Sequence, residues 1–268
     1  MLASARPESQ KPQEHQVSTI LRVLGVIDLF TETKPIWTAD ELIEAQATSR
    51  ATTYRDLRAL VDAGFLAPVS AGAFALGPRF IELDRQIRLG DPLLKIAPPI
   101  MASQREKVGG TQLLCRYYGL RVMSIHEDRY DERIKTSFDR GRPVSLFTSS
   151  TSQVILANLG ADQQQRLFLQ HAGEIAEAGL GANWPAFKER MRSIRERGVA
   201  VASVIDKDLV GVAAPVFTAP DTIAAALTLV RIRKEVDEAA IERLTKLAIS
   251  VTRKISERLQ AVTAKEVA

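Results

Sequence analysis

The first residues that could do chemistry lie between Ser49 and Arg58, where the chain reads SRATTYRDLR. Three arginines, two threonines and one tyrosine fall within these ten residues. Arginine pairs bidentately with guanine, and threonine contacts phosphates or the thymine methyl group. A helix with such side chains near its N-terminus fits the DNA major groove, which is about 12 Å wide. An ordinary solvated charged face is the alternative, and the segment alone is compatible with both interpretations.

A second cluster, TSSTS at residues 148–152, precedes an apolar run that predicts a helix. Serine is a weak nucleophile unless a base activates it. The chain has no G-x-S-x-G pattern, and neither His126 nor His171 has a carboxylate at a suggestive spacing. Hydroxyls and free N–H groups at a helix N-terminus suit the binding of an anion or carboxylate. Plain N-capping by Ser149 or Ser150 explains the same residues equally well, and both interpretations stay open.

Metal and redox chemistry find little support in the sequence. The single cysteine, Cys115, excludes an intrachain disulfide and a cysteine-based zinc site, and the three histidines are scattered. Neither a G-x-G-x-x-G nor a P-loop pattern is present. We therefore expect a protein that is not an enzyme and that uses no cofactor and no metal.

The elements around the arginine-rich segment are predicted to be short helices followed by a hairpin. Apolar residues at three- and four-residue steps between 20 and 30 predict an amphipathic helix. Thr38 and Glu41 have the spacing of a capping box, which starts a second helix. The third helix is capped by Ser49 and ends at Gly64, and two short apolar runs then predict a hairpin.

The helical repeat divides this third helix into two faces. It groups Tyr54 with Leu57, Leu60 and Val61 toward a core, and it directs Thr52, Arg55, Asp56 and Ala59 outward. Three short helices and a terminal hairpin have the layout of a winged helix-turn-helix. This context favours DNA contact over a merely solvated face.

The rest of the chain alternates helical and strand-like segments, which predicts an α+β fold with a sheet flanked by helices. Apolar residues among charges between 78 and 90 predict a linker helix that ends at a Gly-Asp-Pro sequence. We expect a disordered leader at 1–16, a winged helix-turn-helix at 17–77, a linker helix at 78–90, a ligand-binding domain at 91–261 and a tail at 262–268.

Composition sets broad limits on the function. The 268 residues are 46% hydrophobic and 25% charged, as in ordinary globular proteins. The net charge of +4 permits a nucleic-acid partner, although acidic residues slightly outnumber basic ones between 17 and 90. No apolar run reaches the roughly 18–20 residues that span a bilayer. We expect a cytoplasmic protein with no membrane partner.

Four segments, in this order, resemble the IclR family of bacterial transcription regulators over about residues 17–260. The arginine-rich helix resembles the recognition helix, and LVDAGFL is similar to the helix end that leads into the wing. GRPVSLFTSSTSQVILANL resembles the start of the effector-site helix, and RERGVAVA followed by GVAAPVF resembles the C-terminal signature. The resemblance implies a GAF-like effector-binding domain after the linker helix, and dimers or pairs of dimers whose operator binding a small metabolite alters.

The resemblance also implies that Arg50, Thr52, Tyr54 and Arg55 contact DNA. Together with neighbouring polar residues, the expected DNA-binding set is Thr38, Ser49, Arg50, Thr52, Thr53, Tyr54, Arg55 and Arg58.

The effector segment departs from the family pattern. The usual Ala-Ser-Gly-Lys is replaced by residues 150–153, the usual proline by Ser145 and the preferred histidine by Phe147. Ala202 and Ile205 stand where acidic residues are expected. These changes make the pocket less charged, so we hypothesise an aromatic or relatively apolar effector. The expected effector-binding residues are Phe147, Ser149, Ser150, Thr151, Ser152, Val210, Val212, Thr228 and Val230.

The sequence therefore predicts a DNA-binding transcriptional regulator that a small-molecule effector modulates, acting on operator DNA as a homodimer or homotetramer. Two alternatives stay open. One is a ligand-binding module or enzyme whose N-terminal helices serve dimerisation. The other is a regulator that works without an effector.

Overall fold

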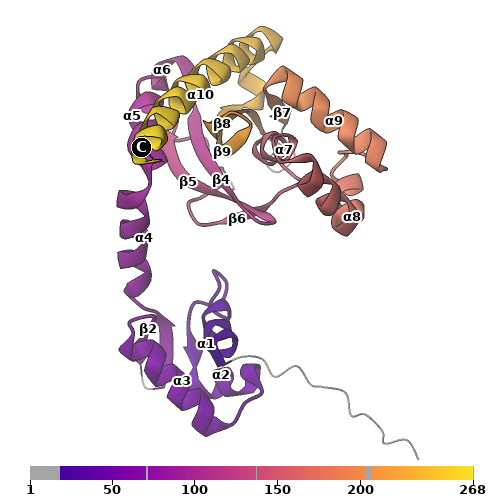
Figure 1. Ribbon diagram of the computed structural model, residues 1–268. Coiled ribbons are helices and arrows are strands. Elements are labelled where there is room, and N and C mark those ends of the chain that lie inside the picture. The colour runs from indigo at the N-terminus through magenta and orange to yellow at the C-terminus, as the bar shows by residue number, and fades with distance from the viewer. Residues whose placement is uncertain (1–18, 71, 137, 203–206, 268) are drawn as a thin grey trace, which may run out of the picture. The chain divides into compact units, whose positions relative to one another are not determined.

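The computed structural model describes residues 19–70, 72–136, 138–202 and 207–267. The chain divides into two compact units, Met1–Arg88 and Leu89–Ala268 (Figure 1). The expected leader at 1–16 and the expected departure at Ile205 lie outside the described residues. No described helix is both long enough and apolar enough to cross a membrane.

The first unit holds three helices, a small antiparallel sheet and most of a fourth helix. Its elements are α1 (Thr19–Asp28), β1 (Trp37–Thr38), α2 (Ala39–Gln46), α3 (Arg50–Asp62), β2 (Leu66–Ser70), β3 (Ala73–Leu76) and α4 (Arg79–Gly90). The strands pair in the order β1-β3-β2. A small core, which includes Val26, Leu42, Leu57, Leu60 and Leu66, joins the helices to this sheet.

Two glycines fix how α3 leads into the hairpin and then into α4. Gly64 follows the end of α3 with a φ of 76°, in the left-handed region that favours glycine. Its carbonyl accepts a hydrogen bond from the Arg79 N–H at 3.0 Å. A Cβ added at Gly77 would lie 2.2 Å from that carbonyl oxygen, so only glycine fits where the hairpin returns.

The second unit is built on one six-stranded antiparallel sheet with the order β6-β5-β4-β9-β8-β7. Its strands are β4 (Thr111–Tyr118), β5 (Arg121–Arg129), β6 (Pro143–Ser145), β7 (Ala200–Ala202), β8 (Leu209–Ala219) and β9 (Thr222–Ile232). Its helices are α5 (Pro92–Ala102), α6 (Arg105–Val108), α7 (Ser150–Ala157), α8 (Ala161–Glu177), α9 (Trp184–Arg197), the 3-10 turn η1 (Arg233–Glu235) and α10 (Glu238–Val267). Helices on a largely antiparallel sheet confirm the α+β class.

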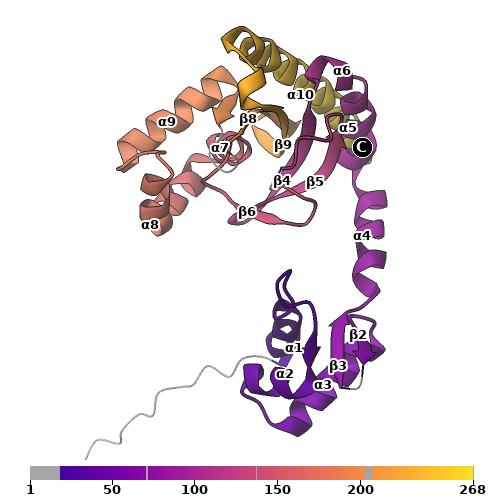
Figure 2. The same cartoon turned by 180° about the vertical axis from the view of Figure 1, so that it is seen from behind.

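The two faces of this sheet carry separate cores and are covered by different helices, as Figures 1 and 2 show for the helices. Helices α5 and α10 cover one face, where Val212 and Leu229 of the strands and Ile255 of α10 are buried together. Helices α7, α8 and α9 pack with the other face, where Phe187 and Ala226 are buried. Because neighbouring residues of a strand point to opposite faces, the buried apolar residues along the middle of β8 and β9 alternate between the two cores.

The last helix extends past residue 261, where the expected ligand-binding domain ends. Helix α10 runs to Val267, so the residues expected as a tail continue this helix up to that position. The segment contains neither glycine nor proline, and its alanines, lysine and glutamate favour helix. The Thr263 hydroxyl also donates to the Leu259 carbonyl at 3.0 Å within the continuing helix.

Candidate DNA-binding surface and effector site

The outward face of α3 is positively charged along most of its length. Arg55 and Arg58 are exposed, and the Tyr54 side chain is 48% exposed. Arg50 pairs with Asp40 of α2 at 2.8 Å, and Arg58 lies 3.8 Å from Asp62, both at the surface. Arg55 has no ion-pair or hydrogen-bond partner within the described part of the chain.

The inward face of α3 differs from the expected one at three positions. Asp56, expected to point outward, is 4% exposed and accepts two hydrogen bonds from Arg22 of α1, at 3.0 and 3.3 Å. Thr53 is fully buried, and its hydroxyl lies 2.8 Å from that of Thr48, so its assignment to DNA contact is wrong. Tyr54 is placed with the exposed residues, not with the core.

The hydroxyl residues at the helix starts have structural partners. Ser49 caps α3: its oxygen accepts the Thr52 N–H at 3.3 Å and donates to the Thr52 hydroxyl at 2.9 Å. Thr38 caps α2 in the predicted capping box with Glu41. The hydrogen bond from the Thr38 N–H, with Lys34 adding to it, lowers the pKa of Glu41 from 4.5 to about 2. The Thr38 and Ser49 side chains are therefore engaged as the N-caps of α2 and α3, respectively.

The TSSTS cluster forms the buried start of α7, whose residues Ser150–Ala157 are all buried. Ser149 is the N-cap: its oxygen accepts the Ser152 N–H at 3.0 Å and donates to the Ser152 hydroxyl at 2.9 Å. The Ser152 hydroxyl in turn donates to the Ser145 carbonyl at 2.8 Å. N-capping thus accounts for Ser149. The N–H groups of Ser150 and Thr151 lie in the first turn, where a helix offers no internal acceptor.

The start of α7 lies against β8 and β9. The Thr151 and Thr228 hydroxyls are 2.7 Å apart and both side chains are buried. A Cβ added at Gly211 would come within 2.8 Å of the Ser150 oxygen and 3.1 Å of a Thr228 methyl carbon. Gly211 therefore lets the helix start approach the strand. Sequence reasoning missed this residue, because a glycine in a strand does not reveal which helix it faces.

Apolar side chains complete this region, although two of the expected ones face elsewhere. Phe147 and Val230 are buried in the core beneath α7, and the Phe147 ring lies 5.6 Å from that of His171. Val212 belongs to the core beneath α10, and Val210, two residues earlier in β8, shares its face. The expectation that Val210 and Val212 line the effector site is therefore wrong, since alternation along the strand turns them away.

The described residues include no cluster of three or more histidine, cysteine or acidic side chains that could hold a metal ion. Burial raises the pKa of Cys115 from 9.0 to about 12, which keeps its thiol protonated and unreactive near neutral pH. The arrangement is suited to binding: a cationic helix face in one unit, and a buried hydroxyl-rich helix start in the other.

Two known sequence families match the chain. "Bacterial transcriptional regulator IclR C-terminal" matches residues 90–257, and "IclR helix-turn-helix domain" matches residues 19–70. Among curated proteins, the HTH-type transcriptional regulator KipR of Bacillus subtilis (strain 168) is 21% identical over 249 residues, covering 90% of this chain and 98% of KipR.

Solved structures of similar proteins share the fold. An IclR homolog from Microbacterium hydrocarbonoxydans, complexed with 4-hydroxybenzoate, has a TM-score of 0.70 and 20% identity, covering 90% of this chain and 98% of that one. The Thermotoga maritima IclR structure also has a TM-score of 0.70, with 18% identity and the same two coverages.

Proposed function

The chain belongs to the IclR family of bacterial transcriptional regulators, and we propose that the outward face of α3 binds operator DNA sequence-specifically. We further propose that a small-molecule effector bound near the start of α7 changes this DNA binding. The observation that carries the proposal is the exposed cationic face of α3, with Arg55 free of any partner among the described residues.

The DNA contacts proposed for α3 come from its exposed side chains. Arg55, Arg58 and Tyr54 reach the groove, and Arg50 exchanges its surface partner Asp40 for a phosphate or a base. That exchange costs little, because exposed ion pairs contribute only about 0–1 kcal/mol. Thr52, half-buried beside the cap, contributes contacts near the helix N-terminus.

Self-association is part of the proposal, since operators are commonly read by symmetric dimers. Helix α1 supports it by exposing Ile20 (71%), Leu21 (63%) and Leu24 (50%). Such apolar exposure on a single short helix is typical of an interface. We propose a homodimer or homotetramer, with half-sites about 34 Å apart or multiples of this spacing.

An aromatic or relatively apolar effector suits the region around α7. Its hydroxyls (Ser150, Thr151, Thr228) and apolar walls (Phe147, Val230) carry no charge. The Microbacterium relative was solved with 4-hydroxybenzoate, which belongs to this chemical class. Isothermal titration should detect 4-hydroxybenzoate or another aromatic acid, and tight binding of small hydrophilic acids alone would contradict the proposal.

A DNA-binding experiment tests the core of the proposal. Duplexes selected from random DNA by the purified protein would be measured by gel shift with wild-type, Arg55→Ala and Arg85→Ala proteins. Arg85 is an exposed arginine on α4 and serves as the matched control. We expect Arg55→Ala to weaken binding about tenfold or more across the selected sequences, a loss of at least about 1.4 kcal/mol. Unchanged binding would remove α3 from this role.

A further inference from the structure

A cavity of about 460 Å³ lies between α6, the end of β9 and the first turns of α10. It is lined by Lys107, Arg231, Ala240, Arg243, Leu244 and Leu247. Leu244 belongs to the core beneath α10, so the cavity lies on the opposite sheet face from α7. Its volume is within the range of small-molecule sites.

The charged residues that line this cavity all have the same sign. Lys107, Arg231 and Arg243 form no ion pair with any described residue. Nearby cations behave differently: Lys246 pairs with Glu242 at 2.7 Å, and Arg133 pairs with Asp131 and Glu235. Arg231 is among the groups that lower the pKa of Asp131, so that carboxylate offsets part of its charge. The remaining repulsion among the three cations is relieved when an anion binds.

Arg231 is held at the cavity by its backbone surroundings. Its Nη1 donates to the Val108 carbonyl at 3.0 Å, while its Nε is buried and has no hydrogen-bond partner within the described chain. A Cβ added at Gly109 would lie 3.1 Å from the Arg231 Nη1, and one added at Gly110 would lie 2.6 Å from the Arg231 Cδ. The two glycines therefore leave room for the arginine side chain. A buried N–H without an acceptor is costly and is uncommon in native proteins.

We propose that this cavity binds a small organic anion. A carboxylate or phosphate group lies among Lys107, Arg231 and Arg243, and an apolar body rests on Leu244 and Leu247. The three cations and the apolar floor together favour an amphiphilic metabolite over a free inorganic ion. This site is distinct from the effector site at α7, and the proposal does not depend on DNA binding by α3.

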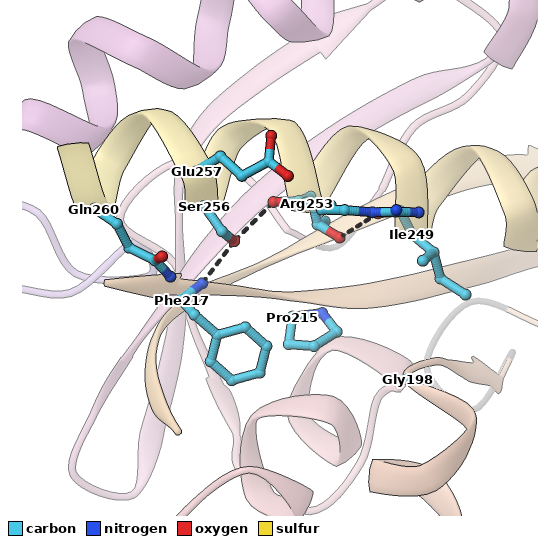
Figure 3. A pocket seen from close by; sticks show the side chains of 9 residues that line it. Gly198, Pro215, Phe217, Ile249, Arg253, Ser256, Glu257 and Gln260 are labelled. Carbon is cyan, nitrogen blue, oxygen red and sulfur yellow. Dashed lines mark hydrogen bonds between the residues drawn. The ribbon is translucent and has the colours of Figure 1, made fainter. Parts of the chain in front are cut away.

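A second cavity under α10 provides the contrast (Figure 3). It has a volume of about 390 Å³ and is lined by residues of α10 together with Gly198, Pro215 and Phe217. Its two charged residues, Arg253 and Glu257, have opposite signs. The Ser256 hydroxyl already accepts the Phe217 N–H at 2.9 Å and donates to the Thr252 carbonyl at 2.7 Å. This cavity therefore lacks the net charge that selects an anion.

The test measures the binding of phenyl phosphate and of benzoate to the full chain by isothermal titration in 0.15 M NaCl. Phenol is the neutral control ligand for phenyl phosphate. We expect phenyl phosphate to bind, and to bind about tenfold more weakly to Lys107→Gln and to Arg243→Gln. Benzoate belongs to the class proposed for the α7 site, so its binding is assigned to this cavity only where the same two substitutions weaken it. The matched control is Arg253→Gln, an exposed arginine of the same helix that lines the second cavity, and it should bind like wild type.

A second readout follows the Arg231 Nε–H signal in ¹H–¹⁵N spectra, which should shift on adding the anion that binds. The proposal is overturned if neither anion binds at millimolar concentration or if phenol binds as well as phenyl phosphate. Equal weakening by Arg253→Gln, no weakening by Lys107→Gln and Arg243→Gln, or a static Arg231 signal would also overturn it. A changed oligomeric state in these variants with unchanged anion binding would identify the surface as a subunit contact instead.

Discussion

Helices α3 and α7 begin with the same hydrogen-bond pattern in opposite surroundings. In each, a serine N-cap accepts the N–H of the residue three positions on and donates to its hydroxyl at 2.9 Å. The cap of α3 is exposed and leads into a cationic face, whereas α7 is buried throughout. The shared cap fixes where each helix begins. The surroundings decide whether the first turn of the helix lies at the surface, as in α3, or inside the domain, as in α7.

The same substitution in the two caps should therefore have unequal effects, and this is the largest effect we predict. Ser149→Ala leaves the buried Ser152 N–H unpaired and should lower the free energy of unfolding by about 2–3 kcal/mol. Ser49→Ala should cost only about 1 kcal/mol, because water can replace the exposed cap oxygen. Urea unfolding of both variants measures the difference.

The two tryptophans, one in each unit, make this measurement specific. Trp37 lies in the first unit and Trp184 in the second. In a Trp37→Phe background the remaining Trp184 reports on the second unit. In a Trp184→Phe background the remaining Trp37 reports on the first unit. Equal losses from the two serine substitutions would contradict the contrast between an exposed and a buried cap.

The buried hydroxyl pair between α7 and β9 should show strong coupling. Thr228→Val leaves the Thr151 hydroxyl without its partner at 2.7 Å, which should cost about 1–3 kcal/mol. The double variant with Thr151→Val should cost less than the sum of the two single variants, because no unpaired hydroxyl then remains. Strictly additive losses in a double-mutant cycle, followed through Trp184, would show that the two hydroxyls do not interact.

The smallest predicted effect lies at the capping box of α2. The hydrogen bond from the Thr38 N–H, with Lys34, lowers the pKa of Glu41 to about 2 in the folded chain. Because folding lowers this pKa, ionised Glu41 stabilises the folded chain fully above pH 4.5, and this contribution is lost as the pH falls toward 2. Thermal unfolding followed through Trp37 should therefore lose part of its pH dependence between 4.5 and 2 in Glu41→Gln. An unchanged pH profile would contradict the assignment.

Local signals predicted much of this architecture. The capping box at Thr38, the cap at Ser49 and the stop at Gly64 lie where the sequence placed them, because each depends on residues close in the chain. The helical repeat placed Tyr54 toward the core, whereas the family resemblance placed it at the surface, where it lies. The repeat failed because Thr53 and Asp56 define the inward face of α3, and polarity alone does not reveal that they are buried. Tyr54 lies about 100° from Thr53 around the helix.

The region around the start of α7 was harder to predict because it depends on pairing between distant segments. Val210 and Val212 looked suitable by type, but the register of β8 against β9 turns them toward α10. Gly211, between them, faces Ser150 and carries no local signal of that contact. The face of a strand follows from the sheet around it, whereas a helix cap follows from a few consecutive residues.

The salt dependence of DNA binding tests the central claim about α3 most directly. Affinity for a selected duplex would be measured across salt concentrations for wild type, Arg55→Ala and the control Arg85→Ala. If Arg55 contacts a phosphate, Arg55→Ala should reduce the slope of log K against log [salt] by about 1 and lower the affinity. Arg85→Ala should match wild type in both. An Arg55→Ala protein with the wild-type slope and affinity would contradict the assignment of α3 as the DNA-binding helix.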